Sequence, residues 1–397
     1  MKECEKMKVF GIVAEYNPFH NGHMHLIDEA KRHGAEAVIV VMSGNWVQRG
    51  DTAIISKFAR AKQALECGVD LVAELPTHWA MATAQKFAEG SFEILENLSV
   101  DTLIFGSECG DVERLIKTAY CVRSSEFSIL MRENLDKGLT PAKARESAVE
   151  TLCGNGELLR SPNDTLAVEY ICAAKSLNSK CKFIAVKRQG TAHDSDIASG
   201  EFCSASHLRD MILSNKLSDA NKYMPEKSFE ILYGEFENGK ISDIKALEKP
   251  ILTALRTTHP GELKQLPDIS EGIENRLFSA ARMSSTLSQL FNYAATKRYT
   301  NARLRRLVLS AFLKAKSGEI PNHVPYIRVL GCNAVGAEVL KSARETTKIP
   351  LIMRSTSLKD NAVFGFETKA TDIYSLSQAV PDPCGSEFTN GVIIKKN

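Results

Sequence analysis

Two histidines follow the first apolar segment of the chain at a spacing that suits phosphate chemistry. The segment Glu15–His23 reads EYNPFHNGH, and it stands between the apolar run Val9–Ala14 and a helical pattern that begins at Gly22. After a strand of a parallel sheet, such a loop lies at the carboxyl edge, where ligands bind. The first turn of a helix offers free N–H groups and a partial positive charge to a phosphate. His20 and His23 are three residues apart, so both rings can face one phosphate.

Imidazoles at this position can catalyse attack on an α-phosphorus. They can donate hydrogen bonds to the oxygens that gain charge in the transition state, where losing one donor commonly costs roughly 3 kcal/mol. Gly22 lets the backbone approach an anion closely. The alternative is that both histidines are solvated surface residues, but the strand–loop–helix context favours the functional interpretation. For His25 and His33, farther along the helix, we expect a structural or surface role.

The alternation of short apolar runs and helical patterns over the first ~210 residues predicts a parallel α/β sheet. We expect strands at 9–14, 37–42, 71–75, 102–105 and 183–187, with helices between them. Beyond residue 213 the alternation stops and helices are predicted, above all over 275–315, while 326–330 and 350–353 could be strands. The sequence therefore predicts an ATP-binding catalytic domain over 1–212 and a mainly helical domain over 213–397.

Composition excludes several classes of protein. Of the 397 residues, 44% are hydrophobic and 25% are charged, which is typical of globular proteins. The net charge is only +2, so nucleic-acid affinity has to come from a local patch. The ten cysteines include no C-x-x-C pair, so we expect reduced thiols and no structural metal. No leader pattern or apolar run of ~18 residues is present, which favours a cytoplasmic protein without a membrane span.

A basic stretch in the second half predicts a surface for an RNA backbone. Between residues 275 and 318 there are nine basic residues and no acidic ones. The apolar stripe of one helix (304, 307, 308, 311, 312) leaves the basic residues largely on other faces, where they are expected to be exposed together. Tyr299 could stack on a base, and the alternative is a solvated face paired with acidic residues elsewhere. The residues predicted to contact RNA are Lys297, Arg298, Arg303, Arg305 and Arg306.

Longer motifs make the pattern more specific. The string GIVAEYNPFHNGH, with MSGNWVQRGD after it, resembles the tRNA(Met) cytidine acetate ligase family of the H-x-G-H nucleotidyltransferase superfamily. Further matches span nearly the whole chain: FGSE, SPND with LAVEY, KRQG, SASHLR, PYIRVLG and ATDIY. The resemblance implies a Rossmann-like sheet of the H-x-G-H nucleotidyltransferase type. It also implies a ligase that forms acetyl-AMP from acetate and ATP and passes the acetyl group to N4 of the wobble cytidine of elongator tRNA(Met).

The resemblance also implies an ATP site, which comprises Val13, Ala14, Glu15, Tyr16, Asn17, Pro18, Phe19, His20, Asn21, Gly22, His23, Met24, His25, Leu26, Gly106, Asn163 and Arg188. By superfamily analogy, Ser206 and Arg209 grip the β- and γ-phosphates. The alternatives are a turn glycine at 106, a helix N-cap at 163, a surface salt bridge at 188 and a plain surface charge at 209. No K-M-S-K-S sequence is present. We expect Mg²⁺ to arrive with ATP, held mainly by phosphate oxygens.

The loop after the second strand is predicted to close over the acid or the incoming cytidine. Arg49 and Lys57 flank it, and the alternative is that both are solvated charges. Trp46 could stack a base or pack beneath the loop. Two other functions stay open: a small-molecule nucleotidyltransferase and a non-catalytic RNA-binding protein. The choice among small acids and the oligomeric state do not follow from the sequence.

Overall fold

The computed structural model describes residues 7–188, 202–270, 272–296 and 298–396. Lys297 and residues 189–190 of the KRQG segment lie outside these ranges. The first half of the chain consists of β1 (Val9–Ala14), α1 (Asn21–Arg32), β2 (Ala37–Ser43), β3 (Trp46–Val47), β4 (Asp51–Thr52), α2 (Lys57–Glu66), β5 (Leu71–Leu75), α3 (Thr77–Ala80), α4 (Ala84–Asn97), β6 (Thr102–Ser107), α5 (Val112–Val122), α6 (Ser125–Asp136), α7 (Pro141–Cys153), α8 (Pro162–Ser176) and β7 (Lys182–Lys187).

The second half is mainly helical but ends in strands. It consists of α9 (Ala205–Leu213), α10 (Leu217–Ala220), α11 (Glu226–Glu237), α12 (Glu248–Thr257), α13 (Pro260–Leu263), α14 (Ile273–Met283), α15 (Leu287–Ala294), α16 (Asn301–Leu313), β8 (Ile327–Cys332), α17 (Ala334–Thr346), β9 (Leu351–Ile352), α18 (Ala362–Ser375), α19 (Ser386–Thr389) and β10 (Ile393–Ile394). The predicted strands are all present, with ends shifted by a few residues. The short helix α13 precedes a stretch up to Gly272 whose described residues form no helix or strand.

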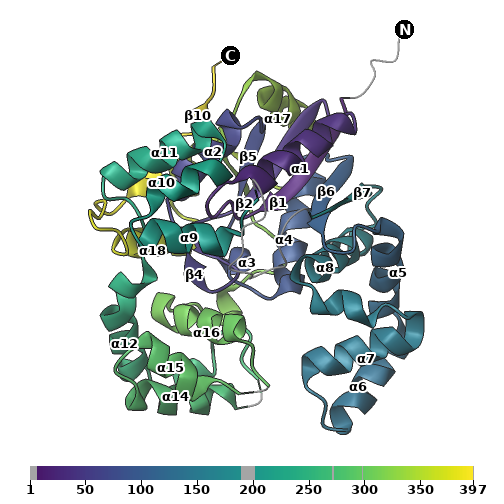
Figure 1. Cartoon of the computed structure of the whole chain (residues 1–397), viewed down its shortest axis with the longest axis vertical. Helices are drawn as coiled ribbons and strands as arrows, with labels where there is room; N and C mark the ends of the chain where they lie inside the picture. The colour runs from purple at the N-terminus through teal and green to yellow at the C-terminus, as the bar shows by residue number, and fades with distance from the viewer. Residues whose placement is uncertain (1–6, 189–201, 271, 297, 397) are drawn as a thin grey trace.

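The strand order of the main sheet places the first loop at a topological switch point. The order is β10-β8-β5-β2-β1-β6-β7, and its central strands can be followed in Figure 1. β1 pairs in parallel with β2 on one side and with β6 on the other. Ligands of such sheets bind in the crevice at the carboxyl ends of the two strands where the order reverses. Here that crevice lies between the loop after β1 and the end of β6.

The far end of the chain completes the sheet. β8 pairs antiparallel with β5, and β9 and β10 each pair in parallel with β8. Strands from both sides of residue 213 therefore belong to one sheet. The apolar run at 326–330 predicted the strand β8, but no local pattern indicates that it pairs with β5, because pairing partners are set by long-range packing.

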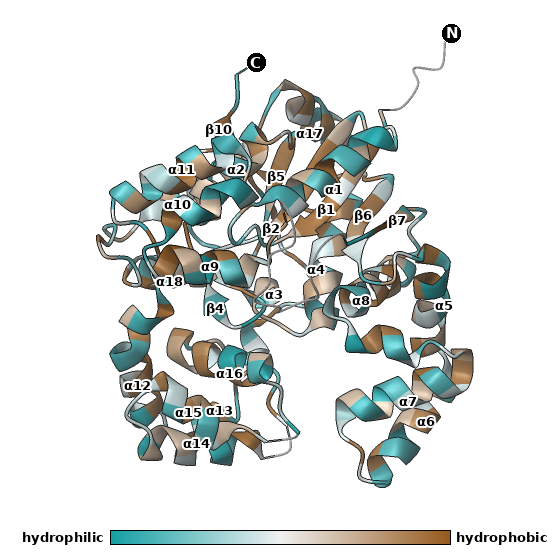
Figure 2. Ribbon diagram, viewed as in Figure 1, coloured by the Kyte–Doolittle hydropathy of each residue, from teal (hydrophilic) through white to brown (hydrophobic). Residues whose placement is uncertain are grey.

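The two faces of the sheet bury alternate residues, as the period of a strand requires. On one face, residues such as Ile39 and Leu103 pack with α4, α8 and α17. On the other, residues such as Ile12, Val40 and Ile104 pack against α1 and α2. Figure 2 shows the central strands mostly in brown, while the surrounding helices carry both colours. The sheet is therefore a buried layer between two layers of helices.

A separate apolar cluster holds the helical lobe, which we define as α12 to α16. Its core includes Leu255, Leu277 and Leu290, and it extends to Trp46 of β3 and to α18. In Figure 1 this lobe and the pair α6 and α7 lie at one end of the molecule, and β10 lies at the opposite end. Because α16 contacts β4, which follows the carboxyl end of β2, the lobe lies on the carboxyl side of the sheet.

Candidate nucleotide-binding and catalytic site

The H-x-G-H loop forms a closed cap on the first helix. His20 is the N-cap of α1, and its Nδ1 accepts a hydrogen bond from Gly22 N at 3.0 Å. In return, the Nδ1 atom of His23 accepts from His20 N at 3.2 Å. The two rings stack with their centroids 3.7 Å apart. The spacing of three residues therefore brings both imidazoles together at the helix start, as the sequence predicted.

These hydrogen bonds determine which nitrogen of each ring can act. A neutral imidazole that accepts through Nδ1 carries its proton on Nε2. Desolvation, with the nearby Arg188 and Arg209 guanidinium groups, lowers the pKa of His20 to about 3. Desolvation, His20 and Arg188 lower the pKa of His23 well below its ordinary value. Both rings are therefore neutral near pH 7, and each has an Nε2–H donor.

Two aromatic residues of the loop support His23 from below. The rings of Tyr16 and Phe19 lie 4.8 and 5.5 Å from the His23 ring, measured between centroids. Both side chains are buried, at 1% and 0% exposure. The family resemblance placed them in the ATP site, but their buried side chains can only position the histidine. Any contact that they make with a ligand has to come from the backbone.

Arg209 is joined to the first loop. Its Nη1 donates to the carbonyl of Asn17 at 2.8 Å. Burial lowers the pKa of Arg209, and the nearby Asp51 and Glu15 oppose this effect. Ser206 lies one turn earlier, in the first turn of α9. The alternative of a plain surface charge is therefore wrong for Arg209, because the guanidinium is partly buried against the loop.

Gly106 and Arg188 face each other across the last two strands. β6 and β7 pair in register, and Arg188 N donates to Ser107 O at 2.9 Å. A Cβ atom on Gly106 would lie 3.6 Å from Arg188 Cγ, so the bare backbone at 106 faces the stem of this arginine. Arg188 is exposed but close enough to both histidines to affect their pKa values. The structure thus gathers Arg188, Arg209 and the histidine pair at one edge.

Asn163 reaches this edge through an acidic partner to which the sequence analysis assigned no role. Its Nδ2 donates to Glu108 Oε1 at 2.6 Å, and Asp164 N donates to Glu108 Oε2 at 3.0 Å. In return, Asp164 Oδ1 accepts from Ser107 Oγ at 2.5 Å and from Glu108 N at 3.0 Å. The N-cap of α8 is Ser161, so the N-cap alternative for Asn163 is wrong. These hydrogen bonds join the SPND and FGSE segments and fix the end of β6.

The two residues that were predicted to flank the loop after β2, Arg49 and Lys57, lie in different environments. Arg49 lies close enough to Arg209 to lower that residue's pKa. Lys57, by contrast, is 0% exposed at the start of α2. Trp46 is also fully buried, and its Nε1 donates to Ala370 O at 2.9 Å, so it packs beneath the loop and cannot stack a base. The prediction of Lys57 as a substrate-loop residue is wrong, because its ammonium is enclosed.

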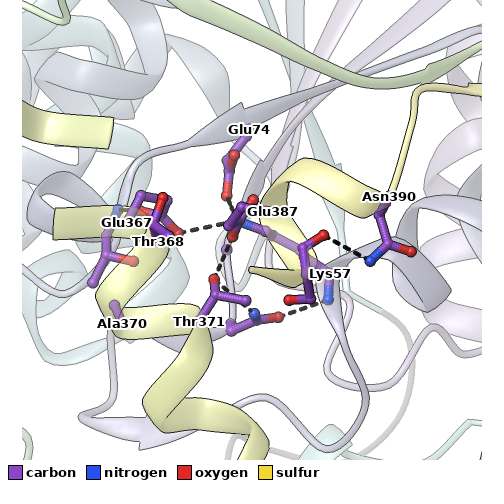
Figure 3. Close-up of polar contacts among 12 residues, drawn as sticks. Lys57, Glu74, Glu367, Thr368, Ala370, Thr371, Glu387 and Asn390 are labelled. Atoms are coloured by element: carbon purple, nitrogen blue, oxygen red, sulfur yellow. Dashed lines mark hydrogen bonds and ion pairs between the residues drawn. The ribbon is translucent and has the colours of Figure 1, made fainter. Parts of the chain in front are cut away.

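Lys57 lies in a buried charge cluster, formed with Glu74, Glu367, Glu387 and Arg328. Figure 3 shows the three carboxylates around the Lys57 ammonium, which lies 3.2 Å from Glu367 Oε1 and 2.5 Å from Glu387 Oε1 and also bonds Glu74. Burial alone lowers the pKa of Lys57, but attraction by the carboxylates outweighs it and raises the pKa above its ordinary value. The cluster joins β5, β8, α2, α18 and α19 next to the loop that follows β2.

The basic helix is less exposed than its periodicity predicted. The side chains of Arg303 and Arg306 are only 16% and 13% exposed, and both pair with Asp268, at 3.5 and 3.4 Å. Tyr299 is buried at 9% exposure, so it does not present its ring to a base. Arg305 is 46% exposed and lies 3.7 Å from Asp51. Of the predicted RNA contacts within the described residues, Arg298 and Arg305 are exposed, whereas Arg303 and Arg306 mainly hold the lobe together.

Two properties of the described part of the chain bear on its class. No helix there has both the length and the apolar character needed to cross a membrane. Among the same residues, no group of three or more His, Cys, Asp or Glu side chains is arranged to hold a metal ion.

Comparison with known proteins extends over nearly the whole length. The HIGH Nucleotidyl Transferase family matches residues 7–386. The tRNA(Met) cytidine acetate ligase of Caldanaerobacter subterraneus is 37% identical over 391 residues, which cover 94% of this chain and 96% of that protein. The protein of the same name from a Thermoanaerobacter species is 35% identical, over 98% of this chain and 100% of that one. The crystal structure of Thermotoga maritima TmcAL bound with alpha-thio ATP matches with a TM-score of 0.90 at 31% identity, covering 98% of this chain and all of that chain.

Proposed function

Since the chain belongs to the tRNA(Met) cytidine acetate ligase family of HIGH nucleotidyltransferases, we propose that it activates acetate with ATP and transfers the acetyl group to N4 of the wobble cytidine of elongator tRNA(Met). One observation carries this proposal: two neutral imidazoles and two arginines gather at the switch point of the sheet. The Thermotoga protein binds alpha-thio ATP, which supports an ATP site in this chain as well.

In the first step an acetate oxygen attacks the α-phosphorus of ATP. The bond from this phosphorus to the bridging oxygen breaks, and pyrophosphate leaves. The Nε2–H groups of His20 and His23 donate hydrogen bonds to the α-phosphate oxygens as these gain charge. Because both rings are neutral, the positive charge for the triphosphate comes from Arg188 and from Arg209, with Ser206 beside it. Asn163 and the bare backbone of Gly106 contact the nucleoside.

In the second step the mixed anhydride meets a weak nucleophile. The cytidine N4 amine attacks the acetyl carbonyl carbon, the bond to the phosphate oxygen breaks, AMP leaves, and the amine proton passes to solvent. Cytosine N4 is weakly basic, so accurate placement contributes more than a strong general base. Arg49, on the loop that covers the edge, is placed to contact the acid or the base, which has to be splayed from the anticodon stack.

Magnesium enters with the nucleotide in this proposal. Mg²⁺ prefers oxygen ligands and commonly keeps substrate phosphates among them. The chain's own residues then bind and orient the nucleotide, and the ion neutralises part of its charge.

The exposed side chains of Arg298 and Arg305 form the proposed RNA contact on the lobe. Arg303 and Arg306 pair with Asp268, whereas Arg298 and Arg305 are exposed at the surface. Positive side chains that reach phosphates contribute affinity without reading sequence. Because Arg305 belongs to the helix that packs on the loop after β3, an RNA bound there lies beside the catalytic edge.

One incubation tests the proposal. The protein is mixed with ATP, labelled acetate and tRNA(Met), the RNA is digested, and the nucleosides are separated. We expect labelled N4-acetylcytidine and pyrophosphate release that depends on acetate. Pyrophosphate release that instead needs a phosphorylated cofactor precursor would favour a small-molecule nucleotidyltransferase. Failure to bind ATP would favour a non-catalytic RNA-binding protein.

A further inference from the structure

The turn between β3 and β4, residues 47–51, connects the first loop to the helical lobe through the backbone of Gln48. The N–H of Gln48 donates to Glu15 Oε1 at 2.8 Å. The carbonyl of the same residue accepts from Arg306 Nη1 at 3.2 Å. Glu15 belongs to the loop that carries the histidines, and Arg306 belongs to α16 of the lobe. Gln48 therefore bonds both parts with its two backbone groups.

Gly50 makes the same junction tight. Its φ angle is +75°, and a Cβ atom added there would lie 2.5 Å from Arg305 Cβ and 2.6 Å from Arg306 N. The second of these is a backbone atom of α16, which cannot turn aside as a flexible side chain can. The backbone of α16 consequently rests directly on the turn, and any side chain at this position pushes the helix away.

Arg306 is held on its other side as well. Its guanidinium also bonds Asp268 at 3.4 Å, and its side chain is only 13% exposed. The lobe therefore contacts the catalytic edge through the largely buried Arg306 and through Gly50, where no space remains for a side chain. This junction fixes the distance between the helical lobe and the first loop, because neither of them can move without losing hydrogen bonds or creating a clash.

We propose that Gln48, Gly50 and Arg306 are positioning residues that fix the helical lobe at the distance from the first loop needed for acetyl transfer. This inference rests on the proposed function. The first step uses only ATP and acetate, which the first loop binds with Arg188 and Arg209. The second step also needs the RNA that the lobe binds, so an error in the spacing of lobe and loop affects the second step more than the first.

The test is Gly50→Ala, measured for three quantities: acetate-dependent ATP–pyrophosphate exchange, the Kd for tRNA, and the single-turnover rate of acetyl transfer from preformed acetyl-AMP. We expect transfer to slow by about tenfold or more, because a misplacement of ~1 Å can cost about 10²-fold. Exchange is expected to fall much less than transfer, because the atoms that a Cβ at position 50 would meet belong to Arg305 and Arg306 of α16 and not to the first loop. The Kd for tRNA reports the Arg305 contact separately and is expected to change less than transfer does.

The matched control is Gly138→Ala. Gly138 has a φ angle of +83°, and none of the described residues places an atom within 4 Å of a Cβ added there. This variant carries a similar backbone strain without the clash, so it should behave like wild type in all three measurements. Equal slowing in both variants would overturn the proposal, because strain rather than lobe position would then be the cause.

A second pair of variants carries the test if Gly50→Ala does not fold. Arg306→Ala removes the bond to Gln48 and should slow transfer, and Arg306→Lys, which keeps a donor and the charge, should restore part of the rate. Wild-type transfer in Arg306→Ala, or equal losses in exchange and transfer, overturns the proposal. If wild-type protein forms no acetyl-AMP, the proposed function fails and this inference fails with it. Normal wild-type activity with normal transfer in the variants refutes the positioning role alone.

Discussion

Replacing Lys57 by methionine removes the central cation of the buried charge cluster while keeping a long side chain. Lys57 bonds three carboxylates, and its ammonium and the side chains of Glu74 and Glu387 are all 0–1% exposed. In the variant these three carboxylates face one remaining cation of the cluster, Arg328. A buried charge that loses its partner keeps its desolvation cost without the attraction that offset it.

The expected loss of stability can be worked from these contacts. Removing one member of a buried ion pair typically costs about 3–5 kcal/mol. Burial raises the pKa of Glu74 to about 7, so near neutral pH this carboxyl can take up a proton and relieve part of the repulsion. We therefore expect the free energy of unfolding to fall by about 3 kcal/mol, at the lower end of that range. Because the unpaired carboxylates gain protons as the pH falls, the difference from wild type should narrow between about pH 8 and pH 5.

Urea titration followed by circular dichroism measures this loss. The control is Lys86→Met, which makes the same chemical change in the pair Lys86–Glu89, 2.8 Å apart but 50% and 36% exposed. An exposed pair contributes at most about 0.5 kcal/mol. The double variant Lys57→Met with Glu387→Gln should recover part of the loss, because it removes one unpaired charge. If Lys57→Met is no less stable than Lys86→Met, the reasoning about the cluster is refuted.

Three further predictions concern activity. His23→Ala should slow acetate-dependent pyrophosphate exchange by about 10²-fold, which corresponds to ~3 kcal/mol, and an unchanged exchange rate would contradict the donor role. Because the variant also loses the hydrogen bond that His23 Nδ1 accepts from His20 N, its melting temperature should fall modestly. The pKa of His20 is lowered to about 3, and that of His23 is also lowered. Protonation of these histidines should therefore reduce kcat/KM for exchange only below about pH 4. A decline near pH 6.5 that disappears in His20→Asn would show that the histidines are not neutral donors. Arg305→Gln should reduce the slope of the logarithm of the tRNA binding constant against the logarithm of salt concentration by about 1, and it should leave pyrophosphate exchange unchanged. An unchanged slope would show that Arg305 does not contact the RNA.

The parts of the site that follow from local pattern were predicted correctly. The strands of the sheet and the histidine pair at the start of α1 depend on apolar runs, a helix start and a spacing of three residues, all of which the sequence displays within one short segment. Strand ends shifted by one or two residues because the sheet extends pairing beyond the most apolar positions, as at Gly106 and Ser107 of β6.

The errors share one physical cause, which is pairing between residues far apart in the chain. Lys57 looked like a loop charge, since its partners lie at 74, 367 and 387. Arg303 and Arg306 lie off the apolar stripe of α16, yet Asp268 from a separate loop encloses them. The role of Asp164, which holds the end of β6, was missed because its partner at position 107 is 57 residues away.

The antiparallel insertion of β8 beside β5 has a consequence for how the protein is made. The ribosome completes β5 at residue 75, but the strand that covers its open edge begins at residue 327. Until then, one edge of β5 in the nascent chain lacks its final neighbouring strand. Exposed apolar edges of this kind promote aggregation and bind chaperones. β5 therefore gains its final neighbour only after residues 327–332 have been synthesised, long after β2 on its other side.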